Sequence, residues 1–138
     1  MTGGPRLQAL PVIPDAERGK LGVAEAGTHV PFQPARAFYL YDLPAGAVRG
    51  EHAHREDQQF LICLSGVFEV VAEYRGLRQT FELSGPEQGL YAPAMTWLEL
   101  RVRIADSLLL VLAARAYDEA DYIRDYDAFR RAALAESP

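Results

Sequence analysis

Short β-rich runs recur along most of the sequence and limit the folds that the chain can adopt. Each run is rich in apolar, aromatic and β-branched residues, and glycine or proline signals separate neighbouring runs. The clearest hairpin covers 68–83, with Arg75 and Gly76 at its turn. Such a series predicts an all-β fold, an antiparallel sandwich or barrel. The runs are 37–43, 59–64, 67–74, 79–83, 90–92, 97–104 and 108–113.

The pattern changes beyond residue 115, where apolar residues recur at helical spacing. Asp118 or Asp125 could cap a helix there, because an aspartate side chain accepts hydrogen bonds from the first free backbone N–H groups. We therefore expect a short helical C-terminal tail that packs on the sheet. The residues at helical spacing are Ile123, Tyr126, Phe129 and Ala133.

The length and charge of the chain narrow its class. A chain of 138 residues, 49% of them apolar, suits one hydrophobic core, so we expect a single domain over 1–138. Fourteen basic and nineteen acidic residues without a long run of either sign predict no nucleic-acid binding. No apolar run approaches the roughly 20 residues that span a bilayer, and we expect a cytoplasmic protein with no membrane partner. Cys63, the only cysteine, lies in an apolar run where we expect it to be buried and unreactive.

Two histidines, His52 and His54, are separated by a single residue. On a strand, both imidazoles then point to the same face. The spacing of glycine, histidine and glutamine over 46–66 resembles the first signature of the cupins, which are jelly-roll barrels. Metal-binding cupins usually have glutamate at the position of Gln59 and a further histidine at the position of Leu98. Because an amide and an alkyl group cannot replace a carboxylate and an imidazole, we expect no tightly bound metal.

The histidine pair and two arginines are the first candidates for chemistry. Imidazoles inside a barrel can give and take protons near neutral pH, although the alternative is that they only fill its interior. Arg49 and Arg18 each precede a glycine, and a guanidinium binds phosphate or sugar oxygens in a planar fork, although ordinary surface ion pairs are the alternative. Tyr39 and Tyr41 share one face of a strand, where core packing is the simpler explanation. The third histidine has no such neighbours and is expected in a surface loop.

Five sequence blocks together resemble the dTDP-sugar 3,4-ketoisomerases, also called WxcM-like or sugar-ketoisomerase cupins. The resemblance covers most of the chain, from residue 15 to residue 129. The last block is the most specific, because no packing requirement explains its succession of tyrosines, aspartates and charged residues. The blocks are 15–21, 38–46, 49–55, 89–93 and 117–126.

The resemblance implies a cupin jelly-roll barrel, a homodimer with exchanged strands, and no metal or organic cofactor. It implies a substrate of the type dTDP-4-keto-6-deoxyglucose, converted to the 3-keto isomer. His52 corresponds to the catalytic base and His54 to its partner. Arg49 would hold the nucleotide diphosphate or orient the sugar, and Arg18 would line the sugar pocket. The remaining candidates for contact with the substrate are Tyr39, Tyr41, Gln59 and Trp97.

The chemistry of the histidine pair agrees with this resemblance. A hydrogen on the carbon beside a ketone is acidic enough for a positioned imidazole to remove, which gives an enediol that accepts the proton on the neighbouring carbon. The sequence departs from the family pattern at Glu51, at 94–96 and at Leu98, where glycine, a Pro-Gly pair and a polar residue are more usual. The stereochemistry at C4 of the product therefore stays open. Two alternatives remain: an epimerase acting on a nucleotide-linked keto sugar, and a non-catalytic cupin that binds a sugar nucleotide.

Overall fold

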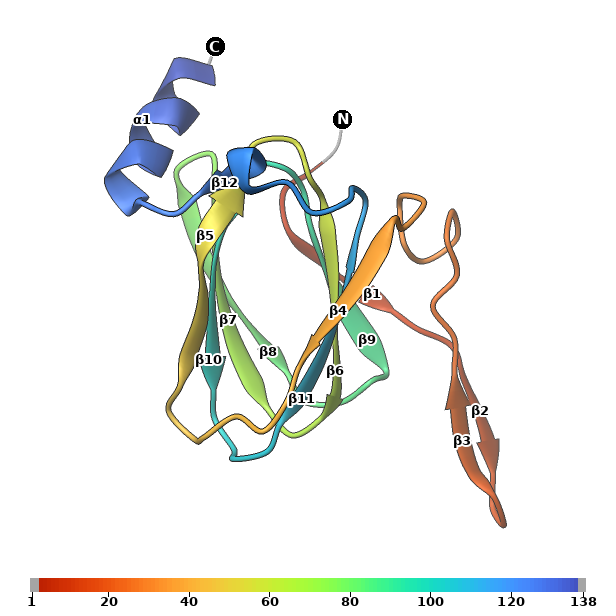
Figure 1. Ribbon diagram of the computed structural model, residues 1–138. Coiled ribbons are helices and arrows are strands. Elements are labelled where there is room, and N and C mark those ends of the chain that lie inside the picture. The colour runs from red at the N-terminus through yellow and green to blue at the C-terminus, as the bar shows by residue number, and fades with distance from the viewer. Residues whose placement is uncertain (1–2, 137–138) are drawn as a thin grey trace.

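Two antiparallel sheets face each other across a shared interior in the computed structural model, which describes residues 3–136 (Figure 1). The first sheet has the strand order β1-β9-β6-β11-β4 and the second has the order β12-β5-β10-β7-β8. A separate hairpin consists of β2 and β3. The elements are β1 (Arg6–Ala9), β2 (Val12–Asp15), β3 (Gly19–Gly22), β4 (Arg36–Leu40), β5 (Val48–His54), β6 (Gln59–Ser65), β7 (Phe68–Tyr74), β8 (Leu77–Leu83), β9 (Gln88–Ala92), β10 (Trp97–Val102), β11 (Leu108–Ala113), a 3₁₀ turn η1 (Glu119–Asp121), β12 (Tyr122–Ile123) and α1 (Tyr126–Glu136).

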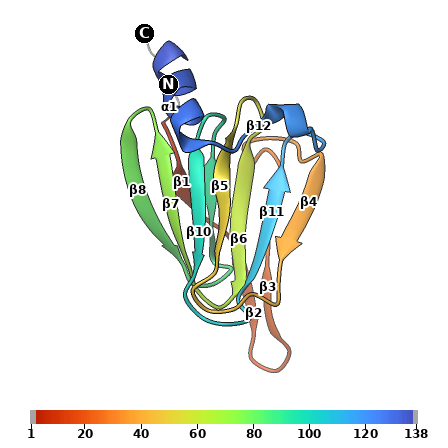
Figure 2. The ribbon, with the colours of Figure 1, turned by 60° about the vertical axis from the view of Figure 1, so that its left-hand side comes forward.

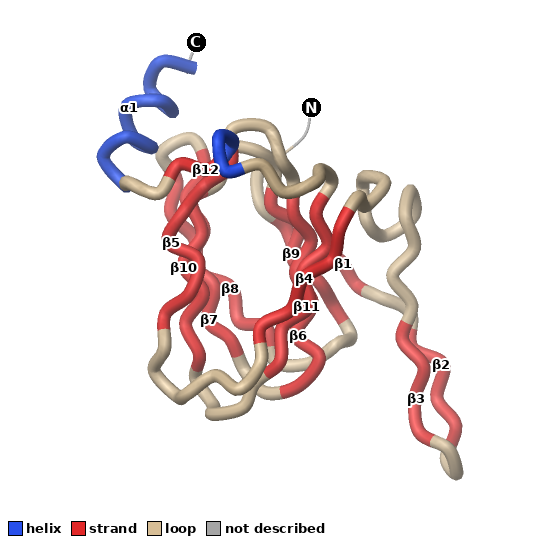
Figure 3. The backbone as a smooth tube through the Cα atoms, in the orientation of Figure 1, coloured by secondary structure: helices blue, strands red, loops and turns tan. Residues whose placement is uncertain are grey.

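The two sheets lie opposite each other (Figure 3), and the main hydrophobic core takes its residues from both of them. It forms because alternate residues of each strand point inward, as in β11, where Leu109, Val111 and Ala113 are buried and their neighbours are partly exposed. From the second sheet, Phe68 and Val70 reach the same core. The predicted all-β fold is thereby confirmed, and its two packed sheets are those of a jelly roll.

The predicted hairpin at Arg75 and Gly76 is also confirmed. Tyr74 of β7 pairs with Leu77 of β8, so the loop between the strands has two residues. Both loop residues have positive φ values, 50° for Arg75 and 83° for Gly76. This conformation matches the right-handed twist of the flanking strands and is typical of tight hairpins.

The C-terminal tail is helical but begins later than the sequence spacing predicted. Ile123 is not part of a helix; it lies in β12 and pairs with Ala53 of β5. The helix α1 follows at Tyr126, and Asp125 accepts a hydrogen bond from the backbone N–H of Ala128 at 2.9 Å. Phe129 anchors the helix on the outer side of the second sheet, where it is 1% exposed. Among the described residues, no helix is long and apolar enough to cross a membrane.

The hairpin formed by β2 and β3 projects away from the barrel in both ribbon views (Figures 1 and 2). Its two strands hydrogen-bond to each other and to neither sheet. Ile13 is 58% exposed and Leu21 is 56% exposed, so the described residues leave more than half of each apolar residue uncovered. These strands, and β1 before them, lie outside the β-rich runs that the sequence predicted.

Candidate active site

A cavity of about 70 Å³ opens into the interior of the barrel between the two sheets. We call it the barrel cavity. It brings together three of the residues that the sequence singled out, Arg49, His52 and Gln59. The rest of its lining is apolar, apart from one glycine of β5. The lining residues are Phe38, Leu40, Arg49, Gly50, His52, Gln59, Leu98, Leu100 and Val111.

A β-bulge sets the position of His52. Opposite β10, the register of β5 shifts between the pairs Leu98–His52 and Glu99–Gly50, which leaves Glu51 as the extra residue. Gly50 and Glu51 both have positive φ, 83° and 57°. A Cβ on Gly50 would lie 3.0 Å from the carbonyl oxygen of Leu98, so this position also needs glycine for space. The bulge turns the imidazole of His52 into the barrel cavity.

One ring nitrogen of His52 is free to accept a proton. Nδ1 lies 3.0 Å from the backbone carbonyl oxygen of Gly50, and because a carbonyl can only accept, Nδ1 carries the hydrogen. Among the described residues, Nε2 has no hydrogen-bond partner. Burial, together with the nearby His54, lowers the pKa of His52 to about 4. The imidazole is therefore neutral at pH 7, with a lone pair on Nε2.

His54 differs because both of its ring nitrogens have partners. Nδ1 lies 3.3 Å from Oδ2 of Asp121, and Nε2 lies 3.0 Å from the side-chain nitrogen of Gln59. The two histidine rings are nearly perpendicular, with centroids 5.0 Å apart. Burial lowers the pKa of His54, although the neighbouring carboxylates of Asp57 and Asp121 oppose this shift. His54 thus lies beside His52 and is held between Asp121 and Gln59.

Residues of the 117–126 block cover this end of the barrel, although none of them was predicted to be part of the site. The Tyr122 ring contacts both histidines, with its centroid 5.0 Å from His52 and 4.2 Å from His54. Arg124 forms two hydrogen bonds of 2.9 Å to Glu119, and its guanidinium lies 4.3 Å from the Tyr122 centroid. The specificity of the block was the only signal for these residues, because their contacts join segments far apart in the chain.

Four predicted substrate-binding residues lie outside the barrel cavity of their own chain. Arg18 lies in the turn of the projecting hairpin, where its side chain is 85% exposed and pairs with Asp15 at 2.6 Å. Tyr39 and Tyr41 are 62% and 61% exposed, because Phe38 and Leu40 are the residues of that segment that line the cavity. Trp97 is buried between the second sheet and α1. These four residues therefore do not line the barrel cavity of their own chain, and their contact with a substrate stays a prediction.

The side chains near His54 do not offer an open set of metal ligands. His54, Asp57 and Asp121 bring ligand atoms within 4.8 Å of one another. Oδ1 of Asp57 accepts hydrogen bonds from the backbone N–H groups of residues 58 and 115, and its Oδ2 lies 3.5 Å from Arg36. Asp121 accepts bonds from the backbone N–H groups of residues 56 and 57. These donors hold the carboxylates in place, and two of the usual cupin ligand positions are Gln59 and Leu98.

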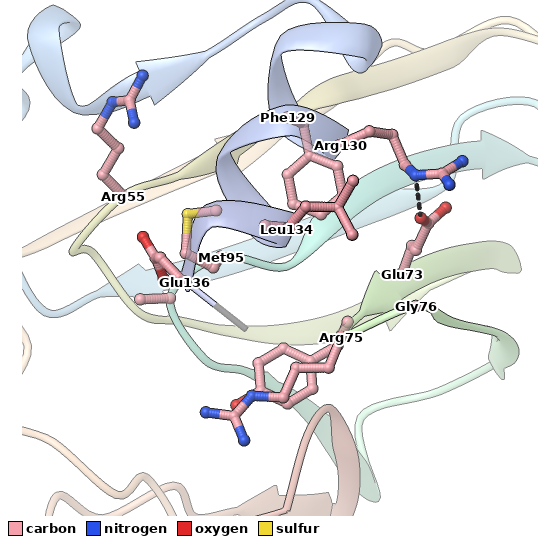
Figure 4. Close-up of a pocket in the computed structure, with 12 residues that line it drawn as sticks. Arg55, Glu73, Arg75, Gly76, Met95, Phe129, Arg130, Leu134 and Glu136 are labelled. Atoms are coloured by element: carbon pink, nitrogen blue, oxygen red, sulfur yellow. Dashed lines mark ion pairs between the residues drawn. The ribbon is translucent and has the colours of Figure 1, made fainter. Parts of the chain in front are cut away.

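A larger pocket of about 260 Å³ lies outside the barrel, beside α1 (Figure 4). Arg130 pairs with Glu73 across it, with a distance of 3.9 Å between the charged atoms. Arg55 and Arg75 point away from each other, so the charges around this pocket do not converge on a ligand (Figure 4). The barrel cavity, which both His52 and Arg49 line, is the better candidate for an active site.

Comparisons with known proteins find sugar 3,4-ketoisomerases among the similar proteins. The family model FdtA, described as WxcM-like, C-terminal, matches residues 4–133. The TDP-4-oxo-6-deoxy-alpha-D-glucose-3,4-oxoisomerase of Aneurinibacillus thermoaerophilus is 37% identical over 114 residues, which cover 83% of this chain and 82% of that protein.

Two solved structures are similar over nearly their whole length. The sugar 3,4-ketoisomerase QdtA from Thermoanaerobacterium thermosaccharolyticum, in complex with TDP, has a TM-score of 0.91, 32% identity and 100% coverage of both chains. A histidine-to-asparagine variant of that enzyme was solved with TDP-4-keto-6-deoxyglucose. A 3,4-ketoisomerase from Helicobacter canadensis has a TM-score of 0.89 and 35% identity, covering 94% of this chain and 97% of its own.

Proposed function

The chain belongs to the WxcM-like, C-terminal family of sugar 3,4-ketoisomerases, and we propose that it converts a dTDP-4-keto-6-deoxyhexose to its 3-keto isomer. The observation that carries this proposal is the free Nε2 of His52 in the barrel cavity. The names of the relatives support the substrate class, because the oxoisomerase acts on TDP-4-oxo-6-deoxyglucose and QdtA was solved with TDP. The reaction belongs to deoxysugar biosynthesis.

The proposed mechanism moves two protons and needs no oxidant. Nε2 of His52 takes the hydrogen from C3, the C3–C4 double bond forms, and negative charge develops on the C4 oxygen. The C3 hydroxyl then gives up its proton to the C4 oxygen, C3 becomes the ketone, and C4 receives a proton from the imidazolium of His52. His54 carries the proton between the two oxygens. Arg49 stabilises the negative charge that develops on oxygen during each transfer.

One incubation tests the substrate, the reaction and the position of the carbonyl. The purified protein is mixed with dTDP-4-keto-6-deoxyglucose in heavy water, and the product is trapped with an aminotransferase specific for 3-keto sugars. The proposal expects a trapped product that carries deuterium at C4. An inverted centre with an unmoved carbonyl would identify an epimerase instead, and a sugar recovered unchanged, without deuterium and without trapped product, would identify a binding protein.

We propose that the reaction needs no metal. Gln59 and Leu98 occupy two of the positions that hold metal in other cupins, and Gln59 instead donates to His54. Turnover should survive a strong chelator, and elemental analysis should find well below one transition metal per chain. A stoichiometric metal whose removal abolishes turnover would contradict the proposal.

We also propose a homodimer in which the projecting hairpins are exchanged. The exposed apolar side chains of Ile13 and Leu21 support this assembly, because they gain cover only from another chain. An apolar groove of about 410 Å³ at the base of the hairpin, lined in part by Leu10, Ile62 and Leu110, offers a surface for a second copy. In such a dimer, Arg18 would act in the partner's site.

A further inference from the structure

Asp121 lies at the junction of η1 and β12, directly behind His54, and the proposed mechanism does not yet use it. We propose that Asp121 is a positioning residue that holds His54 in the tautomer protonated on Nδ1 and stabilises the imidazolium that forms during proton transfer. The proposal deepens the proposed function, since it concerns the histidine that carries the proton between the sugar oxygens.

Two separate contacts require the same tautomer of His54. The carboxylate oxygen of Asp121, 3.3 Å from Nδ1, can only accept, so Nδ1 carries the hydrogen. The side-chain nitrogen of Gln59, 3.0 Å from Nε2, can only donate, so Nε2 carries the lone pair. Nε2 is therefore the nitrogen that can exchange a proton with the substrate. Gln59 keeps it an acceptor until a sugar hydroxyl takes the place of the amide.

The backbone fixes Asp121 before any substrate binds. Its Oδ1 accepts the N–H of Glu56 at 2.8 Å, and its Oδ2 accepts the N–H of Asp57 at 3.1 Å. Its own carbonyl oxygen accepts the N–H of Arg55 at 2.9 Å. The Asp121 side chain is 10% exposed, so little water competes for its contact with His54. A buried and preorganised negative charge beside Nδ1 favours the charged imidazole without further reorganisation.

Several groups besides Asp121 act on the charge of His54. The carboxylate of Asp57 raises the pKa of His54, whereas burial and the guanidinium of Arg36 lower it. Asp121 differs from Asp57 because it alone of the two hydrogen-bonds to the ring. The titratable and charged groups that face His54 are His52, Asp57, Asp121, Tyr122 and Arg36.

Nitrogen NMR tests the tautomer without any substrate. The chain has three histidines, so labelling with ¹⁵N-histidine gives the ring-nitrogen signals of three imidazoles. The signals that disappear in His52→Asn and in His54→Asn assign these two residues. At pH 7, the proposal expects His54 to be neutral with its hydrogen on Nδ1, and Asp121→Asn to shift the tautomer or its exchange. A wild-type spectrum with the hydrogen of His54 on Nε2 overturns the proposal, whether or not the variant folds.

Kinetics separates positioning from a structural role. Asp121→Asn should lower kcat by about 10²-fold, which is the low end of what proton transfer by a side chain contributes, and leave the Kd for dTDP within about twofold. The matched control is Asp118→Asn in the same segment, whose exposed side chain caps η1 and does not touch His54. Its kcat should stay within about twofold of the wild type.

The double variant decides whether Asp121 acts through His54. In the His54→Asn background, Asp121→Asn should cost no more than about threefold in kcat, because residues that act as a unit are not additive. A full second loss of about 10²-fold would mean that Asp121 only supports the fold, and would overturn the proposal. If the wild type fails to turn over dTDP-4-keto-6-deoxyglucose, the proposed function fails, while the NMR result still judges the tautomer.

Discussion

His52 and His54 differ in the surroundings of their ring nitrogens. His52 has one nitrogen on a backbone carbonyl and one toward the barrel cavity, whereas both nitrogens of His54 have side-chain partners. A base that removes a hydrogen from carbon needs a nitrogen lone pair that faces the substrate and accepts no other hydrogen bond. A proton carrier needs a stable tautomer and support for its charged form. These contacts support the proposal that His52 acts at carbon and His54 at oxygen.

The first prediction concerns the base. His52→Asn removes the proton acceptor and keeps a polar group of similar reach, so kcat should fall by about 10²–10⁴-fold with dTDP affinity nearly unchanged. A rate assay together with calorimetry using dTDP measures both quantities. A variant within a few-fold of the wild-type turnover would show that His52 is not the base.

Two further variants serve as comparisons for His52. His54→Asn should lower turnover less, because water can take over part of a relay between oxygens. If the guanidinium of Arg49 binds the diphosphate, Arg49→Ala should weaken dTDP binding. If the guanidinium instead binds the sugar oxygens, the variant should lower turnover and leave dTDP binding unchanged.

The second prediction concerns stability against pH. Because the folded state lowers the pKa of His52 from 6.5 to about 4, the unfolded chain binds more protons between these values. Stability is therefore fully present above pH 6.5 and falls by up to about 3 kcal/mol as the pH drops to about 4. Urea unfolding of the wild type and of His52→Asn at pH 7, 5.5 and 4.5 checks this. Equal pH dependence in the two proteins would contradict the prediction.

The third prediction concerns Glu51, which has a φ of 57° at the centre of the bulge. A non-glycine residue in this region of φ destabilises the folded state by about 1–3 kcal/mol. For glycine the unfavourable contribution is mainly the conformational entropy that it loses on folding. Because the Glu51 side chain is exposed, Glu51→Gly should raise the free energy of unfolding by about 0.5–1 kcal/mol. Glu51→Ala keeps the unfavourable φ and should not stabilise. Chemical denaturation of both variants decides the question.

At the scale of elements, periodicity predicted the strands that face the core and missed those that do not. β4 and β6 to β11 lie within or close to the predicted runs, because their side chains alternate between the interior and the solvent, whereas β5 lies outside those runs. β2 and β3 contain proline and glycines and have no buried face within the chain, so they show no such alternation. The tail of the chain showed helical spacing before its helix began, because Ile123 is buried by β12 and Phe129 by α1.

The candidate site was predictable only where its residues share a strand or a known spacing. Alternation along β5 placed His52 and His54 on one face, and the cupin spacing brought Gln59 to them. Asp121 meets His54 across 67 positions of sequence, so no local pattern could reveal the contact. Tyr39 illustrates a limit of alternation. The pattern places Tyr39 on one face of β4 but does not indicate which face of the strand points into the barrel.

The fourth prediction tests how α1 is held. Phe129 is 1% exposed and packs against Trp97 with ring centroids 5.7 Å apart. Phe129→Ala should destabilise the protein by about 3 kcal/mol, at the lower end for buried aromatic residues, because a surface helix can collapse onto the space. Leu134→Ala on the same helix is the control, since Leu134 is 69% exposed and should change stability by less than about 0.5 kcal/mol. Thermal unfolding compares them, and similar losses would contradict the packing argument.

At the scale of the whole molecule, the fifth prediction uses two inactive chains to test the exchanged dimer. If Arg18 serves the partner's site, a mixture of Arg18→Ala and His52→Asn chains contains hybrid dimers with one intact site. Unfolding and refolding the two chains together should then restore about a quarter of the wild-type activity, as random pairing requires. Each variant refolded alone is the control. No recovery in the mixture, or a monomer by light scattering at micromolar concentration, would contradict the prediction.

The projecting hairpin also has a consequence for how fast the protein becomes active. The barrel core consists of residues of one chain, so it can form at a rate independent of concentration. If the proposed dimer covers Ile13 and Leu21, that step is bimolecular and slows in dilute solution. Refolding should therefore show an early phase in which core fluorescence recovers and a later, concentration-dependent phase in which activity appears. During the interval between them, the uncovered hairpin is the part of the molecule most open to proteases and to pairing with the wrong chain.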